Sequence, residues 1–200
     1  MSGAGKVTFT RMDEGTHDDY ALLEEHEAAF KAQLPARLMA RLRAMDDGLS
    51  GYQVSRLDHS LQTATRARRD GADADWVVTA LLHDLGDELA PENHDTLAAA
   101  IIAPYVREEC TWATRHHGIF QFKYYGDKVG LDPDAREKYR GDPHFAATAH
   151  FCEAWDQTSF DPAYATEPLE SFAPELEEVF LRPAWDEAYL RPGFVTRFVS

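Results

Sequence analysis

The stretch VVTALLHDLGDEL, from Val77 to Leu89, is an apolar helical run that ends in an adjacent histidine and aspartate, His83 and Asp84. Neighbouring residues on a helix point about 100° apart, so this pair cannot chelate one ion as residues four apart do. At a helix end, however, His83 can bind one metal ion while the two oxygens of Asp84 bridge to a second, because two-metal sites are about 3.5–4 Å apart. Gly86 then lets the chain turn away. The stretch therefore indicates a dinuclear metal centre at a helix end.

The composition narrows the class of partner. The 200 residues suit one domain with its own core, and their formal net charge of −15 argues against nucleic acid and anionic membranes. No segment approaches the ~20 apolar residues of a membrane-spanning helix, and the first residues lack the apolar run of a signal peptide. Cys110 and Cys152 lack metal-type spacing and are typical of free thiols. We therefore expect a cytoplasmic protein that acts on a small molecule.

Helical signals dominate the chain, and few stretches alternate with the period of two that strands show. Thr16 followed by Asp19 is typical of a capping box, and Pro35 suits a first helical turn. The pattern predicts an all-α bundle with helices over about 17–33, 35–45, 53–69, 73–85, 93–102 and 104–115, two more that begin at Asp-Pro pairs (132 and 142), and short helices after 162. We expect a single domain over 1–200, with a metal-binding core over about 50–161 and with helices 16–45 and segment 162–200 as additions.

Six residues on these predicted helices carry metal-ligating groups beside apolar helix faces, where charged groups are rare unless they are paired or bind a metal. They are His59, His83, Asp84, His94, His117 and Asp156. One histidine beside an apolar stripe is more often an ordinary core or surface residue, and a lone His-Asp pair is weak evidence. Six candidates in one ordered series favour a shared site, so we expect their helices to converge.

The order His, His-Asp, His, His, Asp resembles that of the HD-domain superfamily of metal-dependent α-helical proteins. The pieces LDHSLQTA, ALLHDLGD and WDQTSFD carry this resemblance, which covers roughly residues 52–161. Within the superfamily, HSLQTA and RHHGIF look most like the mixed-valence diiron oxygenases, the branch of myo-inositol oxygenase and the hydroxyphosphonate-cleaving oxygenases. That resemblance implies two irons on four histidines and two aspartates, activation of O2, and oxidation of a C–H bond beside a hydroxyl.

The same resemblance implies how the six ligands divide between the irons. Carried over by position, the first iron is bound by His59, His83, Asp84 and Asp156, and the second by Asp84, His94 and His117, with Asp84 bridging. Carboxylates with imidazoles suit non-haem iron, manganese and other first-row ions, and the sequence does not select among them. The resemblance favours an Fe(II)/Fe(III) pair with O2 as co-substrate.

The chain departs from the oxygenase pattern near the motif. Asp87 stands where those enzymes have a basic group that contacts the substrate, and Glu153 stands where an arginine would hold phosphonate. Leu49 and Tyr52 take the places of a tyrosine and a glutamate found in the phosphonate enzymes. An acid beside a metal-bound hydroxyl favours a neutral or amine-bearing partner over a phosphate. We therefore expect a small hydroxylated substrate of that kind, with Asp87 as a catalytic group.

Two residues near the predicted ligands are candidates for supporting them. His116 adjoins His117, and we favour His117 as the ligand from the match of HHGIF, with His116 behind it or on the surface. Gln62 lies one helical turn beyond His59, where it is placed to orient the ligand imidazole or to contact the substrate.

Several residues are candidates for the substrate pocket. Lys123, in the aromatic segment FQFKYYGDK, is placed to reach a substrate anion and to act in catalysis, with Tyr124 or Tyr125 lining the pocket. An equally good interpretation is that the aromatic side chains of this segment pack in the core while the Lys123 side chain extends its amine to solvent. Arg140 is placed to bind a carboxylate or a helix end, and Tyr52 is expected to contact the substrate.

Two other functions fit the same ligands. A phosphohydrolase would use two metal ions, manganese or another divalent ion, to activate a water and hold phosphate oxygens, although the acidic stretch GDELAPEN weakens phosphate binding. A metal-stabilised binding module would need the ligands but no open coordination position. Metal analysis of anaerobically purified protein separates these alternatives.

Overall fold

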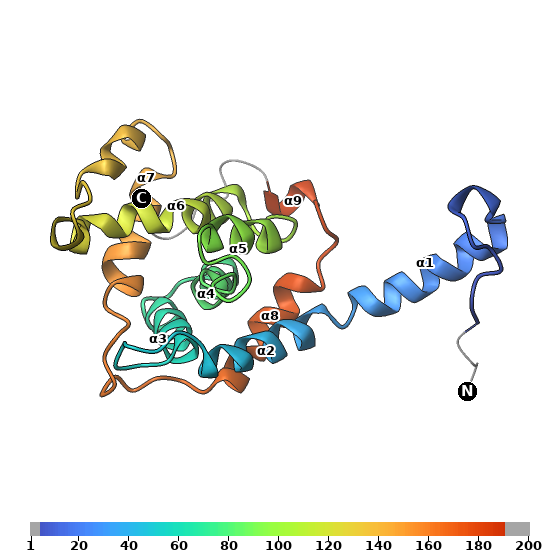
Figure 1. Cartoon of the computed structure of the whole chain (residues 1–200), viewed down its shortest axis with the longest axis horizontal. Helices are drawn as coiled ribbons and strands as arrows, with labels where there is room; N and C mark the ends of the chain where they lie inside the picture. Colours follow the sequence, from blue (N-terminus) through green and yellow to red (C-terminus); the bar gives the residue numbers. More distant parts are fainter. Residues whose placement is uncertain (1–4, 191–200) are drawn as a thin grey trace.

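The computed structural model describes residues 5–190 (Figure 1). Within this range the regular secondary structure is helical, and there is no strand. The predicted all-α fold is thus confirmed over this range. The α-helices are α1 (His17–Lys31), α2 (Leu34–Ala44), α3 (Arg56–Arg69), α4 (Ala74–Leu82), α5 (His94–Ile102), α6 (Glu108–Tyr125), α7 (Phe145–His150), α8 (Ala173–Phe180) and α9 (Glu187–Leu190). Short helical turns lie between them at Met12–Glu14, Met45–Asp47, Gly126–Val129, Ala135–Tyr139 and Leu169–Phe172, and a π-helix covers Phe151–Asp156.

Helix α4 is the centre of the body, and Figure 1 shows it nearly end-on with α3, α5, α6 and α8 around it. Every residue from 75 to 86 is buried, which fits an apolar run with no polar face. The side chain of Asp73 caps the helix by accepting from the backbone N–H of Trp76 (3.2 Å). Because α4 contacts α3, α6, α8 and the π-helix, whatever follows its last residue lies where these elements meet.

Most of the remaining core comes from the flanking helices. Leu38 and Leu42 of α2, and Leu176 and Val179 of α8, belong to the same buried cluster as α4. Helices α2 and α8 contact each other, although they lie more than a hundred residues apart in the sequence. The body therefore includes segments on both sides of residues 50–161.

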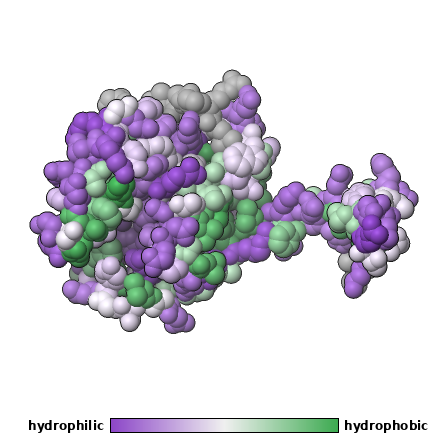
Figure 2. Space-filling view, turned by 45° about the horizontal axis from the view of Figure 1, so that its top comes forward, coloured by the Kyte–Doolittle hydropathy of each residue, from purple (hydrophilic) through white to green (hydrophobic). Residues whose placement is uncertain are grey.

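Helix α1 and the segment before it stand away from this body in both whole-molecule views (Figures 1 and 2). The arm, as we call residues 5–31, is held together internally, because Asp19 accepts from the N–H of Thr8 (2.7 Å) and forms the predicted capping box with Thr16. Among its described residues only Asp19 is buried. The arm contributes no residue to the buried apolar cluster.

Several predicted helix boundaries were wrong, for reasons visible in the structure. Helix α3 begins at Arg56 and not at 53, because Ser55 and Asp58 form a capping box. Helix α4 ends at Leu82, so His83 and Asp84 follow the helix. Helix α6 begins at Glu108, four residues after the expected start, and continues ten residues past the expected end.

The predicted helix from 142 onward is also different, since α7 passes into a π-helix at Phe151. This wider helical turn was not predicted, and it carries Asp156 at its last position. π-helical segments occur frequently at functional sites. Cys110 and Cys152 are buried free cysteines, as expected. Among the helices of the described range, none combines the length and apolar character needed to cross a bilayer.

Candidate metal centre

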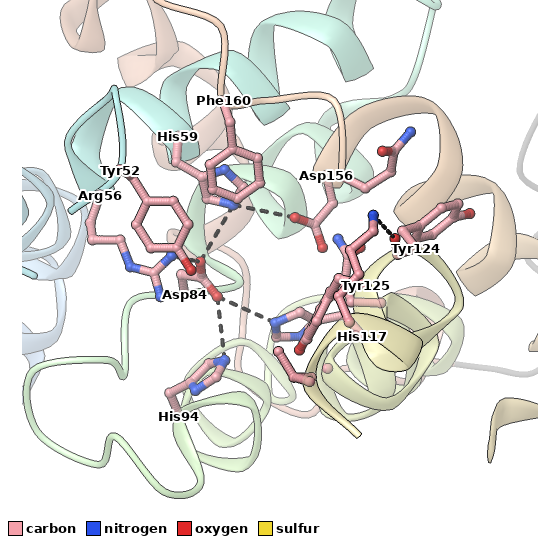
Figure 3. A pocket seen from close by; sticks show the side chains of 15 residues that line it. Tyr52, Arg56, His59, Asp84, His94, His117, Tyr124, Tyr125, Asp156 and Phe160 are labelled. Atoms are coloured by element: carbon pink, nitrogen blue, oxygen red, sulfur yellow. Dashed lines mark hydrogen bonds and ion pairs between the residues drawn. The ribbon is translucent and has the colours of Figure 1, made fainter. Parts of the chain in front are cut away.

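The six predicted ligands come together in one cluster, and all of them except His94 are buried. Figure 3 shows the five that line the adjoining cavity: His59, Asp84, His94, His117 and Asp156. His59 comes from the start of α3, His83 and Asp84 directly follow α4, and the other ligands are His94 at the start of α5, His117 in the middle of α6, and Asp156 at the end of the π-helix. Ligand atoms from this set lie within hydrogen-bonding or ion-pairing distance of one another. The helices thus converge as the sequence predicted.

Asp84 occupies the middle of the cluster, and its two carboxylate oxygens face different partners. Oδ2 lies 3.4 Å from His59 Nε2 and 3.5 Å from His83 Nε2. Oδ1 lies 3.5 Å from His94 Nε2 and 3.3 Å from His117 Nε2. This division creates two groups, which we call the first site (His59, His83, Asp84 and Asp156) and the second site (Asp84, His94 and His117).

The spacing of the donor atoms fits a metal ion in the first site. Ligand atoms about 2.1 Å from a metal lie about 3.0 Å apart in an octahedron and about 3.4 Å apart in a tetrahedron. His59 Nε2 is 3.1 Å from His83 Nε2 and 3.2 Å from Asp156 Oδ1, and His83 Nε2 is 3.6 Å from the same oxygen. Asp156 Oδ2 is buried and has no hydrogen-bond partner. A bound cation would satisfy these unpaired donor atoms.

Three of the four imidazoles are oriented by backbone carbonyls. The Nδ1 atoms of His59, His83 and His117 lie 2.9, 2.9 and 2.7 Å from the carbonyl oxygens of Ser159, Ala80 and Thr114, respectively. An imidazole that donates Nδ1–H to a carbonyl presents the lone pair of Nε2 on its other side. All three lone pairs therefore point into the cluster, as metal binding requires.

His94 is oriented differently from the other three. Its Nδ1 lies 3.2 Å from Asp87 Oδ1, while its Nε2 faces Asp84. Its side chain is 25% exposed, against at most 4% for the other three imidazoles, so the second site lies nearer to solvent. A carboxylate behind a ligand imidazole raises its basicity.

The electrostatics also indicate a site for cations. Burial raises the pKa of both Asp84 and Asp156, but the surrounding imidazoles outweigh it and hold the pKa of each carboxyl well below its ordinary value. Burial lowers the pKa of His59, His83 and His117, but the neighbouring carboxylates outweigh this effect and raise it above the ordinary value. The two aspartates are therefore charged, and the cluster requires protons or metal ions to balance them.

A cavity of about 590 Å³ opens onto both sites. Ligands from both sites contribute to its lining, which places any bound molecule against the metal positions. Aromatic side chains form much of the remaining wall, and Figure 3 shows those of Tyr52 and Phe160 beside His59 and those of Tyr124 and Tyr125 near His117. Phe160 stacks on the ring of His59 with centroids 4.4 Å apart, and Tyr52 stacks on Phe160 at 5.2 Å.

Arg56 is a residue of this cavity that the sequence interpretation missed. Its guanidinium lies 3.5 Å from Asp84 Oδ2 and forms an ion pair with Asp87, and its side chain is only 15% exposed. A signal was present, because Arg56 precedes His59 by three residues and so shares its helix face. Arg56 thus places a permanent positive charge beside the bridging carboxylate.

Asp87 does not line the main cavity, so the structure gives no support to its expected role in setting the charge of the substrate. Asp87 is paired with Arg56 and His94 and lines a separate cavity of about 490 Å³ on the other side of these two side chains. Glu153 is exposed and does not line the main cavity. The two charged residues in the lining besides the carboxylate ligands and the histidines are basic, Arg56 and Lys128. The charges of the cavity lining therefore do not favour an amine-bearing substrate.

Lys123 and Arg140 were also expected near the substrate, and neither lines the cavity. Lys123 lies six residues after His117, about 240° around α6, so it points away from the ligand face and pairs with Asp134 (2.8 Å). Arg140 is exposed and pairs with Glu137. The basic side chain that does reach the wall from this region is Lys128, whose Nζ donates to the carbonyl of Tyr124 (3.1 Å).

The remaining candidates have distinct positions. Tyr52 and Tyr124 line the cavity, in line with the expected substrate contacts. Gln62 is 2% exposed and bonds to the backbone of Asp161, outside the cavity. His116 stacks on Trp112, with centroids 4.0 Å apart, and does not support a ligand, since Thr114 orients the adjacent His117.

Gly86 has a different role from the one that the sequence indicated. Its φ angle is not among the positive values, so a turn does not require glycine there. A Cβ at Gly86 would instead lie 2.6 Å from the carbonyl oxygen of His94 and 2.9 Å from its Cα. The absence of a side chain lets the segment after the His-Asp pair pack directly against the start of α5.

We expect Gly86→Ala to weaken the second site selectively. The added methyl displaces the backbone of His94, and displacement of a ligand or its support lowers metal affinity by about tenfold or more. Stepwise titration with Co(II) measures the two sites. Gly141→Ala is the matched control, because a Cβ there meets nothing within 4 Å. Equal second-site affinity in the two variants would contradict this explanation of Gly86.

Most of these residues lie in a range that is similar to a known domain. The family model of the HD domain matches residues 56–152, a range that contains five of the six ligands: His59, His83, Asp84, His94 and His117. Asp156 and the segment that follows it lie just beyond the matched range. A search among curated proteins gave no match. The match supports the HD-domain superfamily, whose members commonly are metal-dependent enzymes.

Proposed function

We propose that this HD-domain protein is a non-haem diiron oxygenase that oxidises a small hydroxylated substrate with O2. The observation that carries the dinuclear part of the proposal is the division of the Asp84 oxygens between two groups of imidazoles. A single-metal site would use both oxygens on one side or leave one of them to solvent. The iron and oxygenase parts rest on the four-histidine, two-aspartate donor set and on the resemblance of HSLQTA and RHHGIF to that branch.

The unequal ligand numbers support different tasks for the two sites. Divided by the partners of the two Asp84 oxygens, the first site would have four protein ligands and the second three, so the second would keep more positions for a substrate oxygen or O2. The iron pair would supply the activation of O2 and the oxidation of the C–H bond beside the hydroxyl. The chain would orient the substrate between the aromatic walls and limit the access of water.

The protein groups around the second site have tasks of their own. Asp87 keeps the proton of His94 on Nδ1 and so leaves Nε2 free to bind. Arg56 stabilises the negative charge of Asp84 and Asp87. The substrate hydroxyl, once bound nearby, would lose its proton more readily in this positive environment.

A phosphohydrolase is the second candidate, and Arg56 and Lys128 in the cavity lining favour it. Basic side chains bind phosphate oxygens in such enzymes. Arg56, however, is already matched by two carboxylates, and Lys128 is exposed. A non-catalytic binding module is the weaker alternative, because a cavity of about 590 Å³ lies directly against the ligands.

The test is metal analysis of protein purified anaerobically with iron, followed by EPR after partial oxidation. We expect about two irons per chain and the half-integer signal of a mixed-valence pair, together with O2 uptake in a screen of hydroxylated compounds. Manganese or magnesium binding with turnover of phosphate esters would overturn the oxygenase proposal. His117→Gln should lose the second iron, whereas His116→Gln, which alters the neighbouring imidazole outside the cluster, should keep both.

A further inference from the structure

The segment of residues 158–161 follows the π-helix and lies across the first site. The Ser159 N–H donates to the carbonyl of Asp156 (3.0 Å), which ties the start of the segment to the end of the π-helix, whereas the Asp161 peptide group bonds to Gln62. We call this segment the strap. Its Ser159 carbonyl orients His59, and its Phe160 ring both stacks on His59 and lines the cavity. The position of the strap therefore determines the orientation of one metal ligand and the shape of one wall.

One face of α3 holds the strap. His59, Gln62 and Arg66 follow one another at intervals of three and four residues, so their side chains project from the same side of the helix. His59 contacts the Ser159 carbonyl, and Arg66 donates to the Thr158 carbonyl (2.9 Å). Gln62, between them, is the only one of the three that bonds the far end of the strap.

Gln62 makes two reciprocal hydrogen bonds with one peptide group. Its Nε2 donates to the carbonyl oxygen of Asp161 (2.9 Å), and its Oε1 accepts from the N–H of the same residue (3.3 Å). A side-chain amide is suited to this task, because it carries a donor and an acceptor side by side. Gln62 is only 2% exposed whereas Asp161 is exposed, so breaking the pair leaves the buried side-chain amide unsatisfied while the Asp161 peptide group can bond to water.

We propose that Gln62 is a positioning residue for the first metal site, acting through the strap on His59. By fixing the Asp161 backbone, Gln62 keeps the Ser159 carbonyl against His59 Nδ1 and the Phe160 ring against the imidazole. The proposal rests on the metal centre of the proposed function but not on the identity of the reaction. It predicts that loss of Gln62 weakens metal binding at the first site while the second site is unaffected.

The test uses His94→Ala as the background, because this change leaves the first site as the complete one. In that background we compare Co(II) affinity, followed by absorption spectroscopy, with and without Gln62→Met. We expect about a tenfold weaker affinity, the lower end of the range for residues that support a ligand from behind. The ¹⁵N resonance of His59 Nδ1 should also shift in the metal-free protein. Gln62→Glu keeps the hydrogen-bond acceptor but not the donor, so its Co(II) affinity should lie between those of Gln62 and Gln62→Met. It replaces Gln62→Met in the test if that variant does not fold.

Thr65→Val is the matched control. Thr65 is a buried residue of the same helix that accepts a hydrogen bond from the N–H of Glu167 (3.1 Å), so it holds the same C-terminal segment at a point beyond the strap. We expect it to lower thermal stability without changing Co(II) affinity or the His59 resonance. The proposal would be overturned if both Gln62 variants kept the Co(II) affinity of the background, or if Thr65→Val lost as much Co(II) affinity as Gln62→Met. Because Co(II) binding is the readout, these outcomes are independent of whether the protein is an oxygenase.

Discussion

Asp84→Ala is expected to lose both metal ions, reducing the content from about two per chain to about none. Its two oxygens face separate groups of imidazoles, so its removal takes one ligand from each site and the negative charge from between them. His94→Ala removes a ligand of the second site only and should retain about one ion per chain. Metal analysis of both variants, purified anaerobically with iron, measures the difference.

The controls for this comparison lie nearby in the structure. Asp87→Asn keeps the shape of the group behind His94 but removes its charge, and it should lower second-site affinity by about tenfold without emptying the first site. Circular dichroism of each metal-free variant checks that the fold is retained. If Asp84→Ala and His94→Ala held the same amount of metal, Asp84 would not bridge the two sites.

The second large effect is a dependence of stability on pH that differs between metal-free and metal-loaded protein. His59, His83 and His117 have raised pKa values in the metal-free fold, so their protonation stabilises it fully below the ordinary value of 6.5, and this stabilisation is lost as the pH rises through the folded values. The lowered pKa values of Asp84 and Asp156 stabilise the fold above the ordinary value of 3.8, and this is lost as the pH falls through the folded values.

Metal ions replace the imidazole protons, so the loaded protein should not lose stability at the alkaline end. We expect the difference in melting temperature between loaded and metal-free protein to widen steadily between pH 6 and pH 8. Metal affinity should rise over the same interval by about tenfold per pH unit for each proton displaced. Thermal unfolding of both forms across this range measures the effect. Parallel curves would mean that the clustered imidazoles do not exchange protons for metal.

The clustering of the six candidate ligands was predictable from the sequence because each one is a polar residue on an otherwise apolar helix face. His59, His83 and Asp156 have no role in a core unless something binds them. The order of the six residues along the chain then gave the resemblance to the HD-domain superfamily. Asp84 as the central residue also followed from its place directly after a buried helix, since such a carboxylate has two oxygens and little freedom to reach solvent.

The polar residues around the ligands were less predictable, because their positions depend on ion pairs with residues that are distant in the sequence. Lys123 was assigned by its nearness to His117 in the sequence, although a rotation of about 240° around α6 turns it away. Asp87 suggested an acidic pocket, but Arg56, at the start of α3, forms an ion pair with it. The π-helix that carries Asp156 has no clear sequence signal, since its residues have the same apolar pattern as an α-helix.

The carbonyl groups behind the imidazoles have a consequence for the order in which the centre is assembled during synthesis. His83 and His117 are each oriented by a carbonyl in their own helical turn, so these side chains are ready as soon as α4 and α6 form. His59 depends on Ser159, exactly one hundred residues later in the chain. A nascent chain that emerges from the ribosome in order would have the second-site residues well before Asp156 and Ser159. If the first site binds its metal as proposed, its completion would therefore be a late event that follows release of most of the polypeptide.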